Sequence, residues 1–389
     1  MKQEAINYIE SLKEDILNIS KYIYDNPEES YKENKSYKFL VNFLRLHKFS
    51  IKEHFLDIDT SFYASIGTGY PKICFLCQYD AVPKEGHITG HNTISAMSIG
   101  AALGLSKILS SMNCTIILLG CPGEYVGNAI VTMAKQGVFD DIDAVLMAHP
   151  HVTTSESGTS NAIVPLSIRY SYHSDALSFM NKSNYTALDA MMVTFNIINS
   201  IDKTFHEDAS INWILSEGGT SPFLVPKDCE AKFYIRAKNT ELATLIEKKF
   251  KIITSCICEL TNMNCKTSIY GLPYKEFITN PTLSRLFSHN LKEQGIIDVN
   301  TCLNVSAGIS LGDVSHICPT IHPYVKITDN DEVQYGTKAF GESTTSQYCE
   351  DTIIKTSKAL ACTAIDLIEN KHLLSQIKAE FQDKKITRH

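Results

Sequence analysis

The sequence predicts an α/β fold in which a larger domain with a parallel sheet is interrupted by a smaller α+β domain. Three apolar runs of strand length occur in the first 151 of the 389 residues, and helical patterns lie between them, which favours parallel strands. From about residue 164, strand-like runs and helices alternate as in an antiparallel sheet covered by helices. We therefore expect a discontinuous larger domain at 1-163 and 272-389 and an inserted domain at 164-271.

The first half of the chain has a β-α-β-α-β order after two opening helices. Apolar residues at helical spacing from 6 to 23 predict a first helix that ends at Asn26-Pro27, because proline does not continue a helix interior. The remaining expected elements are a helix at 37–46, two strands within 60–80 joined by a turn at 67–69, a helix at 93–112, a strand at 115–119, a helix at 127–137 and a strand at 144–148.

The second half of the chain predicts the inserted domain and a closing helix. Strand-like runs occupy Ile211–Leu215 and Lys232–Ile235, and helical patterns occupy 186–200 and 240–259. A last helical pattern covers 350–370, after strand signals that contain glycine and proline. This order favours an α+β insertion whose flanking segments complete one domain.

Composition and charge are those of an ordinary folded protein. Apolar residues make up 44% of the chain and charged residues 20%, with a net charge of −7 and basic residues spread along the sequence. Such a spread does not predict a nucleic-acid surface or a polybasic membrane patch. We expect the partners to be small molecules or protein, with no nucleic acid and no membrane.

The sequence also predicts a cytoplasmic protein. The amino-terminal segment is amphipathic and carries Glu10, Glu14 and Asp15, which the apolar core of a secretory signal would exclude. No apolar stretch approaches the length expected of a membrane span. Twelve cysteines are scattered without the dense spacing of a disulfide scaffold, and the pair Cys74 and Cys77 lies inside an apolar strand-like run, so reduced thiols are the expectation.

Each of the three strand-like runs of the first half is followed by an ionisable side chain. Asp80 follows the first run, Glu124 the second and His149 the third. The carboxyl ends of parallel strands share the sheet edge at which ligands bind, so these side chains should converge. Glu124 could accept a proton from water, or could be an acid at a helix amino terminus; His149 could be a ligand, or a core histidine.

The loop between Asp80 and the long helix carries His87 and His91, four residues apart and flanked by glycines. Histidines placed in this way at the mouth of a parallel sheet can bind a metal ion. The alternative is that they cap the loop or are solvated. Together with the three strand ends, His91 makes a shared polar site the favoured interpretation.

The motifs of the chain resemble those of a known family of hydrolases. They are Asn26-Pro27-Glu28, Tyr79-Asp80-Ala81-Val82-Pro83, Gly86-His87 with Gly90-His91-Asn92, Gly120-Cys121-Pro122-Gly123-Glu124, His149-Pro150, Gly218-Gly219, Ile235-Arg236-Ala237 and Asp313-Val314-Ser315-His316 with Pro319-Thr320-Ile321-His322. In order and kind they resemble the dinuclear-metal aminoacylases, carboxypeptidases and amidohydrolases. Within that family, the chain is most similar to the N-acyl-amino-acid and p-aminobenzoyl-glutamate amidohydrolases and the related cytosolic dipeptidases.

The resemblance implies a zinc-peptidase-like α/β/α domain, an inserted ferredoxin-like lid and dimerisation domain, and hydrolysis of an amide bond by metal-activated water. It implies five side chains that hold two divalent ions, zinc or manganese. Of these five positions the chain keeps two, His91 and His149. The other three hold Thr89, Tyr125 and Gly336, so the resemblance implies a site reduced to one ion or to none.

Further positions concern the substrate. The resemblance implies that Arg236 binds substrate, and that the inserted domain supplies a histidine for the oxyanion; that position falls on Ala176, with His173 three residues away as a substitute. Where the family has an asparagine after the glycine pair, this chain has Phe223. Loss of an oxyanion donor costs roughly 2 to 4 kcal/mol of transition-state stabilisation, so either the substrate or the turnover has changed.

Two hypotheses follow from these positions. In the first, a homodimeric hydrolase of N-acyl amino acids or small dipeptides uses Glu124 as its base, His91 and His149 as metal ligands, and Asp80 to orient a ligating histidine. In the second, a non-hydrolytic descendant binds a small amide or peptide, or serves as a dimeric partner of another protein. The retained residues favour the first, and the substitutions favour the second.

Overall fold

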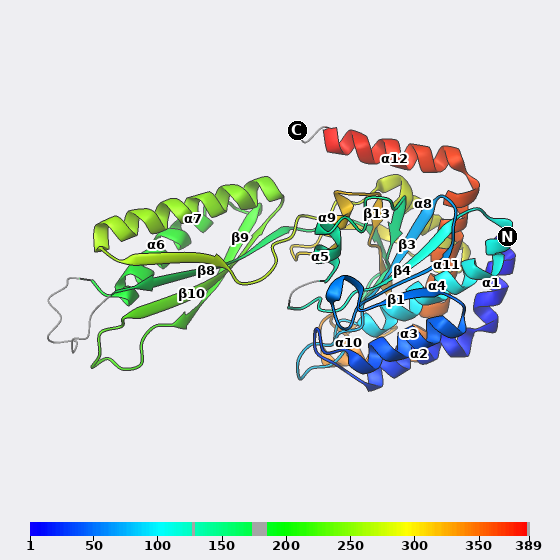
Figure 1. Cartoon of the computed structure of the whole chain (residues 1–389), viewed down its shortest axis with the longest axis horizontal. Helices are drawn as coiled ribbons and strands as arrows, with labels where there is room; N and C mark the ends of the chain where they lie inside the picture. The colour runs from blue at the N-terminus through cyan, green and yellow to red at the C-terminus, as the bar shows by residue number, and fades with distance from the viewer. Residues whose placement is uncertain (127–128, 173–184, 387–389) are drawn as a thin grey trace. The chain divides into compact units, whose positions relative to one another are not determined.

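The computed structural model describes residues 1–126, 129–172 and 185–386. Contacts within the chain divide it into two compact units. The larger unit contains Met1–Thr159, Ile278–Asn304 and Asp313–His389, and the smaller contains Ser160–Phe277 and Val305–Gly312 (Figure 1). The smaller unit therefore extends a few residues beyond the predicted 164-271 at both ends and also includes a separate segment, 305–312.

A six-stranded sheet forms the centre of the larger unit, in the order β1-β2-β4-β3-β5-β13. Its strands are β1 (Ser50–Glu53), β2 (Phe62–Gly67), β3 (Lys72–Cys77), β4 (Thr115–Gly120), β5 (Ala144–Leu146) and β13 (Thr320–Ile321). The strand β3 pairs in parallel with β4 and β5, as the sequence predicts. Ile73 to Cys77 are all fully buried, which explains a continuous apolar run without alternation.

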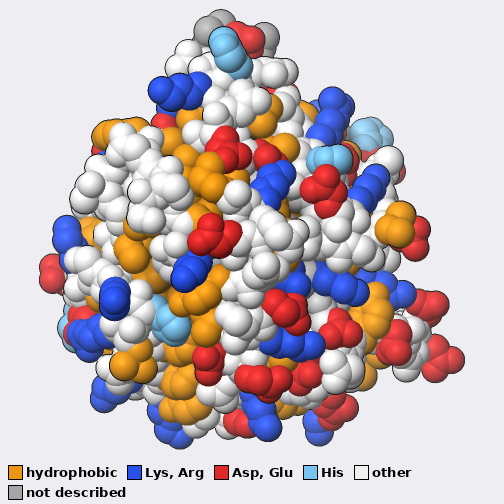
Figure 2. Space-filling model, turned by 90° about the vertical axis from the view of Figure 1, so that its right-hand side faces the viewer, with side chains coloured by type: hydrophobic (Ala, Val, Ile, Leu, Met, Phe, Trp, Pro, Cys, Tyr) orange, Lys and Arg blue, Asp and Glu red, His pale blue; other side chains and the backbone are white. Residues whose placement is uncertain are grey.

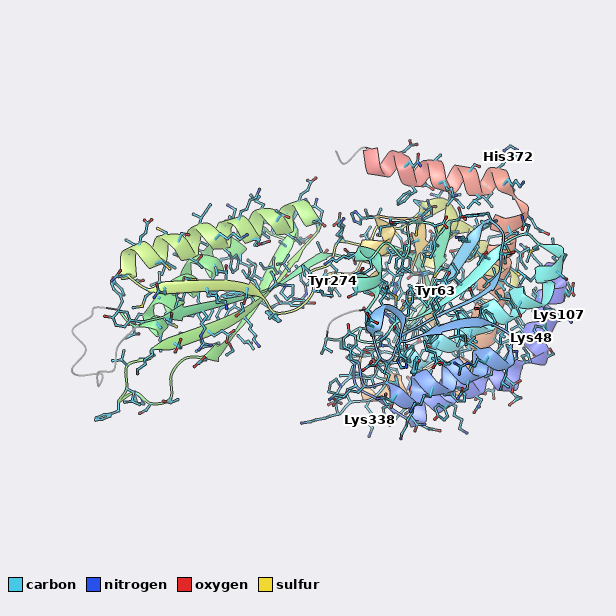
Figure 3. All side chains as sticks on the ribbon, viewed as in Figure 1. Lys48, Tyr63, Lys107, Tyr274, Lys338 and His372 are labelled. Carbon is cyan, nitrogen blue, oxygen red and sulfur yellow. The ribbon has the colours of Figure 1, made fainter. Side chains whose placement is uncertain are left out.

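The central helix of the larger unit is α4 (His91–Ile108), which contacts α1 (Lys2–Ser11), α2 (Lys13–Asp25) and α11 (Gln347–Glu369). Small residues allow these helices to approach closely: a Cβ at Gly104 would lie 2.6 Å from Cδ1 of Ile9 in α1. Lys107, in the last turn of α4, places its Nζ 5.5 Å from the ring centroid of Tyr8 (Figure 3). The core therefore surrounds the helix that begins at a predicted site residue.

In the described part of the chain, one helix is long and apolar enough to cross a membrane by length and composition alone, whereas the sequence analysis expected no apolar stretch of that length. It is α4 together with the turn that follows, His91–Ser111, with a mean hydropathy of 1.3. In the folded chain 78% of that apolar window is buried among the helices and strands of the larger unit. Its hydropathy is accounted for by its place in the core.

On the face drawn in Figure 2, acidic and basic side chains are interspersed.

Two helical expectations for the larger unit were wrong in detail. The predicted opening helix is two helices, α1 (Lys2–Ser11) and α2 (Lys13–Asp25), which meet at Leu12. The apolar spacing continues across the break because both helices pack against α4, so periodicity alone does not reveal it. A last helix, α12 (Lys371–Ile386), was not predicted, because its sequence is largely polar.

The remaining helices of this unit are α3 (Asn34–Leu46), α5 (Ala129–Lys135), α8 (Pro281–Glu293), α9 (Leu311–Ser315, which begins in the smaller unit) and α10 (Lys338–Ser343).

The smaller unit has the βαββαβ order of a ferredoxin-like fold, as the sequence and the family resemblance predict. Its elements are β8 (Ala162–Ser171), α6 (Ala187–Asp202), β9 (Ala209–Glu217), β10 (Asp228–Ala237), α7 (Thr240–Thr261) and β11 (Asn264–Ile269). All pairs are antiparallel, in the order β11-β8-β10-β9. Buried and half-buried residues alternate along β10, so one face of the sheet packs against the two helices.

A third, four-stranded sheet corrects the predicted position of His149. It contains β12 (Asn300–Leu303), β7 (Ser155–Ser157), β14 (Tyr324–Lys326) and β6 (His149–His151). The third strand of the main sheet ends at Leu146, and His149 begins β6, in which Pro150 is an interior residue rather than a strand end. Pro150 is compatible with β6 because this strand lies at the edge of its sheet.

Candidate active site

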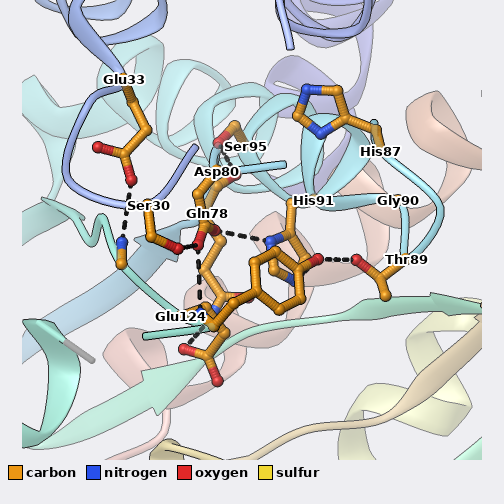
Figure 4. A network of polar contacts seen from close by, with 12 residues as sticks. Ser30, Glu33, Gln78, Asp80, His87, Thr89, Gly90, His91, Ser95 and Glu124 are labelled. Carbon is orange, nitrogen blue, oxygen red and sulfur yellow. Dashed lines mark hydrogen bonds and ion pairs between the residues drawn. The ribbon is translucent and has the colours of Figure 1, made fainter. Parts of the chain in front are cut away.

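The best-defined contact at the sheet edge joins Asp80 to His91. Asp80 comes shortly after β3, and His91 is the first residue of α4. Oδ1 of Asp80 lies 2.9 Å from Nδ1 of His91, and Oδ2 accepts hydrogen bonds from the Ser30 hydroxyl at 2.7 Å and the Tyr125 amide at 3.4 Å (Figure 4). With both oxygens occupied, Asp80 fixes the His91 ring and leaves Nε2 as its outward nitrogen.

Asp80 and His91 each stabilise the charged form of the other, although both side chains are buried. Burial alone would raise the pKa of Asp80, but the hydrogen bond and charge of His91 hold it below its ordinary value. Burial alone would lower the pKa of His91, but Asp80, and to a smaller degree the charge of Glu124, raise it. The Asp80 carboxylate is therefore ionised, and Glu124 lies close enough to act on the same imidazole.

Tyr125 and Thr89 occupy two of the positions at which the resemblance implies metal ligands. The Tyr125 ring stacks on His91, with centroids 4.9 Å apart and planes 10° from parallel. Its hydroxyl lies 3.4 Å from Nε2 of His91 and makes a short hydrogen bond with the Thr89 hydroxyl. Burial, followed by the charge of Asp80, raises the pKa of the Tyr125 phenol, so this group remains protonated. Two hydroxyls thus satisfy each other where the family implies a thiolate and a carboxylate.

Glu124 lies in the turn that follows β4, half-buried. Its Oε2 accepts a hydrogen bond of 2.7 Å from Nε2 of Gln78, which follows β3. The amide of the preceding Gly123 donates to Oε1 of Glu33 at 3.0 Å. Gln78 and Glu33 were not identified from the sequence, because their partners lie 46 and 90 residues away along the chain.

His149, the first residue of β6, lies near His91. Its ring is edge-on to that of His91, with centroids 6.1 Å apart and planes at 90°. Nδ1 of His149 lies 2.9 Å from the carbonyl oxygen of Pro150. Burial, and then the neighbouring His322 and His91, hold the pKa of His149 well below its ordinary value, so the imidazole is neutral. A neutral imidazole is the form that binds metal ions.

An aromatic group around His149 was not predicted as part of the site. Centroid separations from His149 are 5.1 Å to His322, 5.8 Å to Tyr324 and 6.0 Å to Tyr335. Burial lowers the pKa of His322 to about 4, so this imidazole is also neutral. The sequence signal was present in the motif that contains His322, but only spatial contact connects it with His149.

The donor set does not fit two metal ions. Within residues 1–126, 129–172 and 185–386, no group of three or more His, Cys, Asp and Glu side chains is arranged to hold an ion. His91 and His149 each have Nδ1 next to an oxygen acceptor, the arrangement typical of metal-ligating histidines, so these two side chains are suited to provide two ligands of one ion, fewer than the three or four protein ligands usual for zinc. At Gly336 a Cβ would meet open space, but the backbone has φ +78°, which disfavours a histidine there.

The remaining predicted residues make other contacts. His87 is buried, and its Nε2 lies 3.0 Å from the carbonyl oxygen of Ile23, so it has the role of a core histidine. Arg236, in β10 of the smaller unit, makes a short hydrogen bond with the Asn212 side chain and lies 4.8 Å from the Tyr234 ring centroid. Phe223, also in the smaller unit, is 57% exposed. His173 and Ala176 lie outside the described residues.

Comparisons with known proteins find dipeptidases and amidohydrolases among the relatives of this chain. No protein-family model matches the chain. An Xaa-Arg dipeptidase from Mus musculus is 27% identical over 402 residues, which cover 99% of this chain and 93% of the relative. One subunit of a p-aminobenzoyl-glutamate hydrolase from Escherichia coli is 26% identical over 317 residues, covering 75% of this chain and 65% of the relative. The structure of a dinuclear metal binding peptidase from Bacillus subtilis matches with a TM-score of 0.69 at 14% identity, over 92% of this chain and 99% of that one.

Proposed function

We propose that the chain is a member of the dinuclear-metal family of aminoacylases, carboxypeptidases and amidohydrolases, and that it hydrolyses the amide bond of an N-acyl amino acid or small dipeptide with one divalent ion, zinc or manganese. The names of its relatives, a dipeptidase and a p-aminobenzoyl-glutamate hydrolase, support an amide substrate. The observation that carries the proposal is the convergence of Asp80, His91, Glu124 and His149 through the contacts described above.

Glu124 is the proposed general base. Its carboxylate takes a proton from the attacking water and delivers it to the nitrogen of the leaving amine, as the amide carbon–nitrogen bond breaks. The hydrogen bond from Gln78 holds this carboxylate in one orientation. Asp80 keeps the His91 ring oriented through Nδ1. An ion held by His91 and His149 would polarise the amide carbonyl.

Arg236 is the proposed substrate-binding residue of the smaller unit. A guanidinium group can donate two parallel hydrogen bonds to a carboxylate, and amino-acid and dipeptide products carry one. Its present partners, Asn212 and the ring of Tyr234, are neutral, so its charge is not neutralised by them. His173 remains a candidate for the same substrate or for its oxyanion, although it lies outside the described residues.

A homodimer formed through the smaller unit is also proposed. The strand β9 is the edge of its four-stranded sheet, so one side of its backbone has no partner strand in the described chain. Its exposed side chains include Trp213 at 43%, Ile214 at 62% and Leu215 at 45%. An exposed apolar edge strand is suited to pairing with a second copy.

The twelve cysteines are all free thiols, which supports the predicted cytoplasmic location.

The hydrolase proposal can be tested with metal analysis and one pair of variants. Protein purified without chelator is analysed for zinc and manganese, and turnover is measured on a panel of N-acyl amino acids and dipeptides. We expect about one ion per chain, and turnover that falls by at least about a hundredfold in Glu124→Gln. Glu85→Gln removes one exposed carboxylate from the neighbouring loop and should leave turnover unchanged.

Two outcomes would reject the proposal. One is less than about half an ion per chain together with no turnover in the wild type, and the other is turnover that is equal in wild type and Glu124→Gln. In either case the residues at the sheet edge do not work as a hydrolytic site of this family.

A second candidate function is favoured by the contacts of Tyr125. Because its hydroxyl lies beside Nε2 of His91 and bonds to Thr89, a protein that binds a small amide or peptide without hydrolysing it is consistent with the same structure. Isothermal titration with the same panel separates the two candidates: binding without product formation, in protein that contains no ion, favours the binder.

A further inference from the structure

We propose that Glu33 is a positioning residue that holds the turn carrying Glu124 and Tyr125 in place at the sheet edge. This inference goes beyond the metal and base positions and rests on the proposed role of Glu124. It concerns only residues of the larger unit.

The carboxylate of Glu33 is fully buried and accepts three hydrogen bonds. Oε1 accepts from the backbone amide of Tyr31 at 2.9 Å and from that of Gly123 at 3.0 Å. Oε2 accepts from the Thr60 hydroxyl at 2.8 Å. One side chain therefore links the segment before α3 to the residue that directly precedes Glu124.

The same segment also contacts the turn that follows β3. The Ser30 hydroxyl donates to Oδ2 of Asp80 at 2.7 Å, and the carbonyl oxygen of Glu28 accepts from the amide of Ala81 at 2.7 Å. Residues 28–33 thus connect the two turns that carry the acid–histidine pair and the proposed base. Because each turn makes hydrogen bonds to this one segment, the spacing between Asp80 and Glu124 depends on where that segment lies.

The contact at Gly123 is close and conformationally specific. Gly123 has φ +78°, in the left-handed region, and a Cβ at this position would overlap the ring of Tyr31. The amide of Gly123 donates to Glu33 in this backbone conformation, which glycine adopts without strain. If Glu33 could not accept, the buried amide of Gly123 and the part-buried amide of Tyr31 would lose this partner.

The burial of the Glu33 carboxylate indicates that this residue does more than fill space in the core. Burial, opposed by the hydrogen bond from Thr60, raises the pKa of Glu33 to about 7. An acid whose ionised form is disfavoured in the folded chain reduces stability at neutral pH, so packing alone would favour an uncharged residue. In Glu33→Gln the amide oxygen can accept from the amides of Tyr31 and Gly123 without the charge, and the amide nitrogen would donate to the Thr60 hydroxyl, which can also accept. Alanine could make none of these hydrogen bonds.

The experiment compares Glu33→Ala and Glu33→Gln with Glu28→Ala as the matched control. Glu28 lies in the same segment, and its carboxylate accepts from the amides of Lys35 and Ser36 at the start of α3 but from neither turn. Backbone hydrogen exchange of residues 118–126 is measured by mass spectrometry under conditions in which all variants are folded. We expect exchange to be about tenfold faster or more in Glu33→Ala and unchanged in Glu33→Gln and Glu28→Ala.

Turnover gives a second readout. Glu33→Ala should lower kcat with little change in KM, because it displaces the base and not the substrate-binding residues, and Glu33→Gln should restore kcat. If Glu33→Ala does not fold, Glu33→Asp keeps the charge but shortens the side chain, and should show the same two effects to a smaller degree. A wild type without turnover would reject the proposed hydrolase and leave the exchange comparison intact. Equal exchange in wild type and Glu33→Ala or Glu33→Asp, or equal acceleration in Glu28→Ala, would overturn the assignment of Glu33.

Discussion

The hydroxyl oxygen of Tyr125 lies 3.4 Å from Nε2 of His91, and the two rings are stacked with centroids 4.9 Å apart. This contact is where the site differs from the one that the family resemblance implies. A neutral phenol contacts the nitrogen that points away from Asp80, where the family resemblance implies a carboxylate ligand. Compared with that expectation, this position carries no negative charge, and the His91 imidazole is instead supported by the stacked ring.

Restoring two ligands should increase metal binding. In Thr89→Cys with Tyr125→Glu, a thiol and a carboxylate replace the two hydroxyls beside His91, and we expect about one further zinc ion per chain relative to wild type. Elemental analysis after dialysis measures the change. Thr89→Ser with Tyr125→Gln provides similar side-chain sizes without the two ligands and should gain no ion. Equal metal content in both double variants would contradict the assignment of these positions.

Asp80→Asn should strongly destabilise the chain. Asp80 is fully buried and accepts from three donors, and an amide group would turn a donor toward one of them, so we expect the free energy of unfolding to fall by roughly 3 to 5 kcal/mol. Urea unfolding measures the loss. Asp141→Asn is the control, since Asp141 pairs with Lys72 at the surface and should matter little. A stability equal to that of wild type would mean that the Asp80 contacts do not hold this edge.

The free energy of unfolding should fall in acid because of His87. Burial, followed by the charge of His91, lowers the pKa of His87 to about 4 in the folded chain, below its ordinary value of 6.5. Between these values the unfolded chain binds more protons, so stability is full above about pH 6.5 and is lost as the pH falls toward 4. His87→Gln should remove about 2 kcal/mol of the loss between pH 8 and 5. His372→Gln, at an exposed position of α12 (Figure 3), should not alter the profile; an unchanged profile in His87→Gln would contradict the prediction.

Glu33 should give the opposite pH dependence. Its pKa of about 7 in the folded chain lies above the ordinary value of 4.5, so its contribution to stability is full below about pH 4.5 and is lost as the pH rises through 7. Glu33→Gln should therefore gain roughly 2 to 3 kcal/mol relative to wild type between pH 5 and pH 8. Urea unfolding at the two pH values measures the difference. A constant difference between the two proteins would show that Glu33 does not titrate in this range.

A charge in the edge strand of the smaller unit should prevent dimerisation. Ile214 is 62% exposed in β9, and Ile214→Glu places a carboxylate at the proposed interface, so the chain should elute as a monomer in light-scattering chromatography. Ile297→Glu introduces the same charge at a 71% exposed position of the larger unit and should leave the dimer intact. A monomeric wild type would exclude the homodimer.

The strands of the main sheet could be predicted from sequence because their burial leaves a local signature. Residues 73–77 and 115–119 are apolar almost throughout, as expected for strands covered on both faces. The break at Leu12 could not be predicted, because the apolar spacing passes through it without a change of phase. His149 was assigned to the end of the third strand because only two residues separate it from Leu146, and sequence does not show that the chain changes sheet between them.

The contacts of the site depend on pairs that are distant in sequence. Asp80 and His91 lie only 11 residues apart along the chain, and the hydrolase hypothesis had already placed Asp80 as the residue that orients a ligating histidine. Gln78 and Glu33 make contacts across 46 and 90 residues, and no local pattern indicates such partners. Tyr125 was identified only as a position that lacks the expected ligand; its ring contacts His91 across 34 residues of chain, which the identity of a single residue does not specify.

His91 is the first residue of a helix enclosed by three others, so its backbone cannot shift without disturbing the packing of Gly104 against Ile9. The imidazole is thereby anchored to the core of the larger unit, whereas Thr89, Tyr125 and Gly336 lie outside that helix. Evolution can exchange such peripheral side chains one at a time while the frame stays intact. A fold of this kind can drift away from its ancestral chemistry long before its architecture becomes unrecognisable.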